Sequence, residues 1–129
     1  TMGYATIPVR EKPRVAVIST GDELVTPGTE LEGGSIYESN SYGLCALLEK
    51  IGCTPILKDV VVDSMDALRT TLDSLDCDII LTSGGVSMGE FDYVRKLMEE
   101  EGDIHFWKVA MRPGGPPLFG TRKGTPLFG

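Results

Sequence analysis

Short apolar runs alternate with amphipathic stretches along most of this chain. The runs VAVI and IIL are typical of strands that are buried on both faces of a parallel sheet. Strands are predicted at residues 15–18, 54–62, 78–81 and 104–110. The segment PLFG occurs twice, at residues 117–120 and 126–129, and the polar turn between the copies predicts a β-hairpin. A further short hairpin is predicted at residues 35–37, inside a loop rich in glycine.

Three amphipathic helices separate the predicted strands. The first is predicted over about residues 41–51, with Asn40 as its N-cap. The second begins at Asp63 or Ser64, either of which is a favourable N-cap residue. The third follows a glycine-rich loop and ends at about Glu101, before a glycine.

This order of elements predicts one domain of the α/β class. Strands that alternate with helices form βαβ units, so we expect a three-layer α/β/α fold with a mostly parallel sheet and a C-terminal β-hairpin. Residues 1–13 are polar and contain two prolines, which predicts a linker or the tail of a preceding domain. The domain itself is expected over residues 14–129, truncated at its C-terminal end because Gly129 directly follows a predicted strand.

The charge balance narrows the classes of partner. The chain has 129 residues and a formal net charge of -7, from 12 Lys+Arg against 19 Asp+Glu. Nucleic acids and anionic membranes require a basic surface, so neither is expected as a partner. There is no apolar run of about 20 residues and no signal-peptide pattern, and we expect a cytoplasmic protein. The three cysteines lack metal-ligand spacing and are expected to be reduced, buried thiols.

Polar and charged residues collect where the predicted strands end. Parallel sheets bind ligands beyond the carboxyl ends of their strands, so these residues are expected to converge on one edge. The four strands deliver Thr20, Gly21 and Glu23; Asp63; residues 83–92; and Lys108 with Arg112. The convergence of acids, hydroxyls, glycines and cations predicts a ligand site.

Three acids at this edge, Glu23, Asp63 and Asp92, predict a Mg²⁺–phosphate site, because Mg²⁺ favours carboxylates, water and substrate phosphates. Structural alternatives exist for two of them, since Asp63 fits an N-cap and Asp92 an acid in a first helical turn. Glu90 fits a capping box with Ser87 and is interpreted as structural.

The glycine-rich loop TSGGVSMG leads from a strand into a helix, and the amides of such a loop bind anions. It matches neither the GxGxxG nor the GxxxxGK[ST] motif. Lys108 and Arg112 are interpreted as the only positive charges near this edge, and a bound phosphate or oxyanion would need them.

Three segments carry a resemblance to a known family. They are STGDEL at residues 19–24, SGGVSMGEFDY at 83–93 and MRPGGPP at 111–117. Together they resemble the molybdopterin molybdotransferase family, which includes the bacterial MoeA type and the gephyrin E domain. From about Arg14 onward the chain resembles the central molybdopterin-binding domain of that family. The resemblance implies an enzyme of molybdenum cofactor biosynthesis that inserts molybdate into adenylylated molybdopterin with Mg²⁺ and releases AMP.

The resemblance also implies roles for individual residues. Glu23, Asp63 and Asp92 correspond to the family's acids around metal and molybdate, and Lys108 joins them as a catalytic residue. The candidate substrate-binding residues are Thr20, Gly21, Ser83, Gly84, Gly85, Ser87, Arg112, Pro113 and Gly114. A homodimer is implied, with the active site completed by the partner subunit.

Two other functions remain open at this stage. The sister adenylyltransferase has the same fold, but its loop typically contains TGGTG, whereas this chain has SGGVSMG. A non-catalytic scaffold or peptide-binding module is the other alternative, since the gephyrin E domain also binds receptor peptides.

Overall fold

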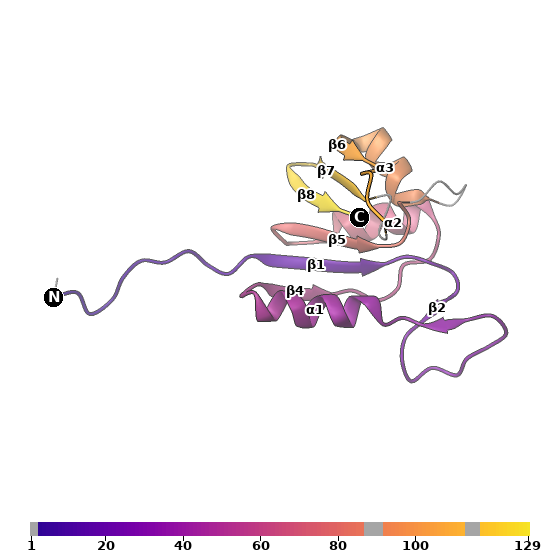
Figure 1. Ribbon diagram of the computed structural model, residues 1–129, viewed down its shortest axis with the longest axis horizontal. Helices are drawn as coiled ribbons and strands as arrows, with labels where there is room; N and C mark the ends of the chain where they lie inside the picture. Colours follow the sequence, from indigo (N-terminus) through magenta and orange to yellow (C-terminus); the bar gives the residue numbers. More distant parts are fainter. Residues whose placement is uncertain (1–2, 87–91, 113–116) are drawn as a thin grey trace.

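The computed structural model describes residues 3–86, 92–112 and 117–129, and its arrangement is shown in Figure 1. Strands and helices alternate through its first two-thirds. The elements are β1 Arg14–Ser19, β2 Leu24–Val25, β3 Ile36–Tyr37, α1 Asn40–Lys50, β4 Thr54–Leu57, α2 Met65–Asp73, β5 Ile79–Ser83, α3 Tyr93–Glu101, β6 Gly102–Trp107, β7 Leu118–Arg122 and β8 Thr125–Phe128.

The main sheet has six strands in the order β4-β1-β5-β8-β7-β6. β4, β1, β5 and β8 are parallel neighbours, while β7 is antiparallel to both β8 and β6. The predicted hairpin is confirmed, with Phe119 opposite Phe128 and Gly120 opposite Leu127. Because two antiparallel steps restore the direction, β6 runs the same way as β5. Its carboxyl end therefore lies at the same edge as those of the parallel strands.

The sheet is covered by helices on both faces, which confirms the three-layer α/β/α prediction (Figure 1). On one face, Val15 and Val17 of β1 pack with Leu48 of α1. On the other, Ile18 of β1 and Ile80 of β5 join a larger core with residues of α2 and α3. Successive side chains of a strand point to opposite faces of the sheet, and here each face has a core. Both sets of side chains are therefore apolar, which explains the unbroken apolar runs in the sequence. Burial of each such side chain contributes about 1.5–3 kcal/mol.

Three predicted strands or hairpins differ from the structure. The strand predicted at 54–62 is shorter, since β4 ends at Leu57. Beyond it, the amides of Lys58 and Val61 still donate to the carbonyls of Val17 and Ser19, and Val61 forms an isolated bridge with Thr20. The strand predicted at 104–110 ends at Trp107, because Lys108 has a left-handed φ of 64° that turns the chain. The hairpin predicted at 35–37 is wrong. β3 instead pairs parallel with β2, with Leu24 opposite Ile36.

The helix ends contradict one prediction, the N-cap at Asn40, and confirm two others, the N-cap at Ser64 and the end of α3 at Glu101. Ser39, not Asn40, is the N-cap of α1, and its side chain makes no capping bond. Ser64 is the N-cap of α2 and accepts a long hydrogen bond of 3.5 Å from the amide of Ala67. Gly102 follows α3 with an extended φ of -127° and starts β6. A Cβ there would lie 2.9 Å from Cε of Met98, so close packing is the reason for this glycine.

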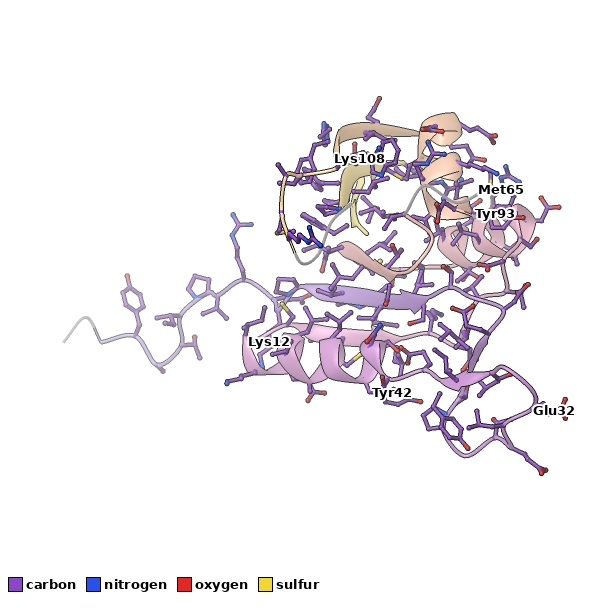
Figure 2. All side chains as sticks on the ribbon, turned by 45° about the vertical axis from the view of Figure 1, so that its right-hand side comes forward. Lys12, Glu32, Tyr42, Met65, Tyr93 and Lys108 are labelled. Carbon is purple, nitrogen blue, oxygen red and sulfur yellow. The ribbon has the colours of Figure 1, made fainter. Side chains whose placement is uncertain are left out.

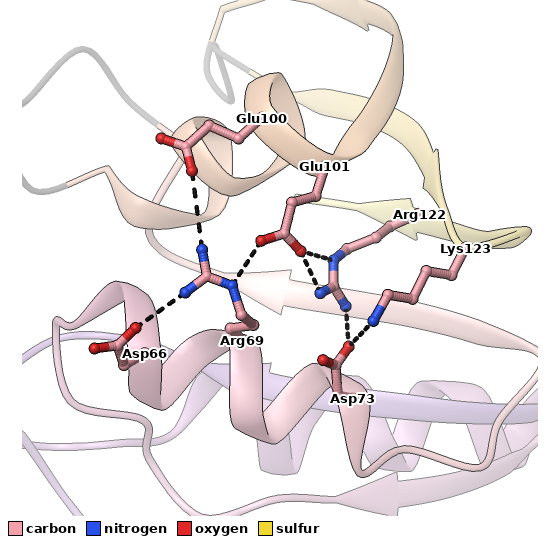
Figure 3. Close-up of polar contacts among 7 residues, drawn as sticks. All are labelled: Asp66, Arg69, Asp73, Glu100, Glu101, Arg122 and Lys123. Carbon is pink, nitrogen blue, oxygen red and sulfur yellow. Dashed lines mark hydrogen bonds and ion pairs between the residues drawn. The ribbon is translucent and has the colours of Figure 1, made fainter.

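A network of ion pairs joins α2, α3 and β7 on one side of the sheet (Figure 3). Its centre is Arg122, whose side chain is 4% exposed. The guanidinium donates to Asp73 at 2.7 Å and to Glu101 at 2.6 Å. Glu101 also accepts from Arg69 at 2.6 Å, and Lys123 donates to Asp73 at 2.8 Å. Because these residues come from three elements, the network fixes both helices against the hairpin.

Three expectations drawn from composition concern the N-terminal segment, membrane-spanning helices and the cysteines. Residues 3–13 are exposed and contain no helix or strand, and Figure 1 shows them extending away from the sheet. No helix in the described residues is long and apolar enough to cross a membrane. The three cysteines are free, and all are half-buried rather than fully buried. Burial raises the pKa of Cys45 and Cys77, which keeps both thiols in the unreactive protonated form.

Candidate functional site

Backbone hydrogen bonds hold the carboxyl ends of the central strands together. The amide of Thr20 donates to the carbonyl of Ser83 at 3.1 Å, which joins the end of β1 to the end of β5. The amide of Gly21 donates to the carbonyl of Val61 at 3.5 Å, which joins the same segment to the loop after β4. The segments that carry Glu23, Asp63 and the glycine-rich loop are therefore brought to one edge.

The two glycines after Ser83 are required by contacts inside the protein. Gly84 and Gly85 have left-handed φ values of 97° and 70°. A Cβ on Gly84 would lie 2.7 Å from the carbonyl oxygen of Thr20, and one on Gly85 would lie 2.7 Å from Cγ2 of Val94. Packing of the loop against β1 and α3 is thus sufficient to explain both residues. Ser87, also predicted as a substrate-binding residue, lies outside the described residues, as does Glu90.

Three neighbouring acids act on the pKa of Asp63 at this edge. Burial is the main cause that raises the pKa of Asp63, and the negative charges of Asp22, Glu23 and Asp92 raise it further. The amide of Asp63 donates to Oδ1 of Asp22 at 2.9 Å. The predicted trio of Glu23, Asp63 and Asp92 is thus brought together, and sequence reasoning missed a fourth member, Asp22. Its position beside Glu23 in the motif STGDEL was the available signal.

Asp92 is the most buried of the four acids. It is 7% exposed and stands at the N-cap of α3, yet its side chain makes no capping hydrogen bond. Within the described residues, its Oδ2 accepts no hydrogen bond, and the hydroxyls of Thr20 and Thr82 are likewise buried without a partner. Buried polar atoms are normally bonded, and an unpaired buried carboxylate oxygen is costly. Asp92 is therefore well suited to bind a cation or a ligand donor.

The acids do not form a ready-made metal cage. Across residues 3–86, 92–112 and 117–129, no group of three or more His, Cys, Asp or Glu residues lies close enough together to hold a metal ion. The exposed Glu23 side chain folds over Gly21, where a Cβ would lie 2.7 Å from Oε2. Mg²⁺ commonly takes only one or two carboxylates together with water and substrate phosphates. The raised pKa of Asp63 and the unpaired oxygen of Asp92 fit such a water-rich site.

Three cations lie at or near this edge. Lys108 is exposed (Figure 2), and its Nζ lies 4.5 Å from the centre of the Trp107 ring. Cζ of Arg95, in the first turn of α3, lies 4.7 Å from the same ring. The interpretation that Lys108 and Arg112 are the only positive charges here is therefore wrong. Arg112 is exposed, while the two other residues predicted in its turn, Pro113 and Gly114, lie outside the described part of the chain.

A buried carboxylate that sequence reasoning missed organises the start of α1. Glu38 is 4% exposed and accepts hydrogen bonds from the Ser19 hydroxyl at 3.0 Å, from the Ser41 amide at 2.8 Å and from the Ser41 hydroxyl. Burial raises the pKa of the Glu38 carboxyl, but these hydrogen bonds outweigh burial and the net pKa is lowered. The side-chain amide of Asn40 in turn donates to the Ser83 hydroxyl at 3.1 Å. Glu38 thus links β1 and α1 next to the glycine-rich loop.

Replacement of Glu38 by glutamine should lower the unfolding free energy by about 1–2 kcal/mol, because an amide cannot accept all three hydrogen bonds. Urea denaturation at neutral pH measures the loss. Glu32→Gln is the matched control, since Glu32 is exposed on the loop that projects from the sheet (Figure 2). Equal stability of the two variants would contradict the role assigned to Glu38.

The fold and the edge define the class of protein. A mostly parallel α/β sheet carries a glycine-rich loop, a group of acids and several cations at the carboxyl ends of its strands, which is the usual ligand-binding position in this architecture. The chain belongs to the family described as "Probable molybdopterin binding domain", whose model matches residues 16–129.

Individual relatives agree with this family. A molybdopterin molybdenumtransferase from Nostoc sp. is 45% identical over 118 residues, which cover 89% of this chain and 27% of the relative. The structure of a molybdopterin biosynthesis MoeA protein from Pyrococcus horikosii matches with a TM-score of 0.77 and 35% identity, covering 92% of this chain and 29% of that one. The chain thus spans less than a third of either relative.

A third similarity concerns the fold alone. The tungsten cofactor synthesizing protein MoaB from Pyrococcus furiosus matches with a TM-score of 0.60 at 15% identity, covering 93% of this chain and 82% of that protein. At this identity the match indicates a shared architecture and carries no information about activity.

Proposed function

We propose that this chain is the molybdopterin-binding domain of a molybdopterin molybdotransferase. The proposed reaction inserts molybdate into adenylylated molybdopterin and releases AMP in a Mg²⁺-dependent step. The names of the relatives support this reaction. The observation that carries the proposal is the buried, unpaired Oδ2 of Asp92, which stands among acids beside the glycine-rich loop. We also propose that the whole protein is cytoplasmic and works as a homodimer.

In this proposal, the acids act through one shared cation. Asp92 and Asp63 would hold Mg²⁺, with Glu23 reaching it through water, because Glu23 is exposed and Asp92 is buried. When bound, Mg²⁺ neutralises phosphate charge and so favours departure of AMP. Mutual repulsion of the acids is relieved at the same time, which links metal binding to the raised pKa of Asp63.

The remaining residues would bind the anionic parts of the substrates. The hydroxyls of Thr20 and Ser83 and the amides of Gly84 and Gly85 are the proposed donors to phosphate and pterin, because these segments meet at the strand ends. Gly21, whose amide donates to Val61, stays in the proposal on the strength of the sequence resemblance. Lys108 and Arg112 are proposed to neutralise the oxyanion or phosphate. Ser87, Pro113 and Gly114 stay in the proposal on the strength of the sequence resemblance.

The sister adenylyltransferase, which the sequence resemblance left open, is the second candidate. It is disfavoured by the loop sequence SGGVSMG and by the transferase names of the more similar relatives. An adenylyltransferase would consume Mg-ATP with molybdopterin, whereas a molybdotransferase would consume adenylylated molybdopterin with molybdate. These two substrate pairs distinguish the functions directly.

The test is a chimera in which residues 16–129 replace the matching segment of the Nostoc molybdenumtransferase. We expect it to release AMP from adenylylated molybdopterin when molybdate and Mg²⁺ are supplied, at a rate within about tenfold of the parent. Circular dichroism and the melting temperature check that the chimera is folded. A folded chimera that releases no AMP, or one that instead turns over Mg-ATP with molybdopterin, would overturn the proposal.

A further inference from the structure

Trp107 contacts three parts of the candidate site, although nothing in the motif analysis pointed to it. It is the last residue of β6 and is half-buried. Its indole Nε1–H donates to the carbonyl of Val86 at 3.0 Å. Val86 directly follows the two left-handed glycines, Gly84 and Gly85. The indole therefore fixes the position at which the described part of the glycine-rich loop ends.

The same ring contacts two cations. Cζ of Arg95 is 4.7 Å and Nζ of Lys108 is 4.5 Å from the ring centre, both within the range of a cation–π interaction. The backbone reinforces both positions. The amide of Arg95 donates to the carbonyl of Gly85 at 3.1 Å, and the amide of Lys108 donates to that of Pro117 at 3.0 Å. Lys108 also adopts the left-handed conformation, which is uncommon for a non-glycine residue.

Arg95 retains unused hydrogen-bonding capacity. One of its terminal nitrogens, Nη1, pairs with Glu99 at 2.8 Å. Its Nε is buried and, within the described residues, has no acceptor. A guanidinium has five N–H donors in a planar fork that suits phosphate oxygens. An unpaired donor beside an anion-binding type of loop indicates that a ligand oxygen can complete this site.

We propose that Trp107 is a positioning residue that holds Arg95 and Lys108 at the glycine-rich loop, where the two cations bind the diphosphate group of an anionic ligand. The inference rests on the proposed function, since adenylylated molybdopterin contains a diphosphate. Both cations keep their contact with the ring in the complex, so the ring holds them in place for the ligand. The negative charge of the bound diphosphate beside the two cations then changes the surroundings of the indole.

Trp107 itself reports this change, because it is the only tryptophan among the 129 residues. Titration of the chain with inorganic pyrophosphate in the presence of Mg²⁺ should shift or change the intensity of tryptophan emission. Lys108→Met and Arg95→Met should each reduce the change and weaken pyrophosphate binding. A purely structural tryptophan would show the same emission with and without pyrophosphate, which would overturn the inference.

Substitutions of Trp107 test positioning separately from folding. Calorimetry should show that Trp107→Leu weakens pyrophosphate binding by about tenfold, because both cation–π contacts are lost. Trp107→Phe keeps an aromatic ring and loses only the N–H donor, so we expect it to recover most of the affinity. Phe106→Leu is the control, since the neighbouring Phe106 is 44% exposed and, within the described residues, no cation–π contact joins its ring to either cation. Melting temperatures identify any variant that fails to fold.

The outcomes separate this inference from the proposed function. If Trp107→Leu is folded and binds pyrophosphate as tightly as the wild type, the positioning role is wrong, whatever the chimera does. If pyrophosphate does not bind the wild-type chain, the diphosphate site is wrong, although AMP release by the chimera would still support the transferase. If Trp107→Leu binds pyrophosphate weakly and the folded chimera is inactive, the diphosphate site is supported and the proposed transferase activity is wrong.

Discussion

The Arg122→Ala variant is expected to lose about 3 kcal/mol of unfolding free energy at pH 7. Removal of one partner from a buried ion pair typically costs about 3–5 kcal/mol. We place this variant at the lower end because the side chains of Glu101 and Asp73 are 27% and 40% exposed, so water can replace part of the lost contacts. Three hydrogen bonds to these carboxylates disappear together with the packing of a buried side chain. Urea denaturation measures the loss.

Lys123→Ala is the matched control for this network (Figure 3). Lys123 donates to the same oxygen of Asp73 as Arg122 does, but its side chain is 64% exposed. Exposed pairs contribute about 0–1 kcal/mol, so this variant should remain near the wild-type stability. If the two variants lost equal stability, burial of Arg122 would not be the source of the effect.

The pH dependence of stability gives a second readout. Lys123 and Arg122 lower the pKa of Asp73 from 3.8 to about 2, and Arg122 and Arg69 lower the pKa of Glu101. An acid whose pKa is lower in the folded state stabilises the fold above its unfolded pKa, and this contribution is lost as pH falls through the folded pKa. Wild-type stability should thus fall as pH drops from about 3.8 to about 2. The Arg122→Ala variant should show a shallower fall.

The layers of the fold follow directly from the sequence, because strand and helix periods differ and each buried position can be assigned locally. The order of the strands does not. The hairpin β7–β8 lies between β5 and β6, with Ile80 opposite Leu127. That pairing joins residues far apart in the chain, and no local pattern specifies it. The direction of β6, and hence the edge reached by Lys108, depends on this insertion.

The candidate site shows the same division between local and long-range information. The positions of Glu23, Asp63 and Asp92 at one edge could be predicted because each lies in the segment that follows a predicted strand. Glu38 could not, since its role depends on burial against Ser19. The Arg95–Trp107 contact joins a helix to a strand end and is likewise invisible in the sequence.

The Asp92→Asn variant is expected to separate stability from function. The side chain of Asp92 makes no capping hydrogen bond that could be lost, and asparagine is equally favourable at an N-cap position, so the unfolding free energy should change by less than about 1 kcal/mol. Mg²⁺-dependent binding of adenylylated molybdopterin, measured by calorimetry, should weaken by about 10- to 100-fold. That range is typical even for groups that only orient a metal ligand. Asp66→Asn, at a side chain that is 94% exposed, is the control with the same chemical change.

The pKa of Asp63 in the Asp92→Asn variant is a third measurement, which tests whether Asp92 and Asp63 belong to the same ligand site. The negative charge of Asp92 is one of the causes that raise the pKa of Asp63, so the substitution should lower that pKa, as followed by carboxyl NMR signals. A lower pKa at Asp63 together with lost binding would show that the two acids share one site. If the pKa of Asp63 fell but binding were unchanged, Asp92 would lie near the other acids without contacting the ligand or its metal ion. Its charge would then affect the neighbouring Asp63 only.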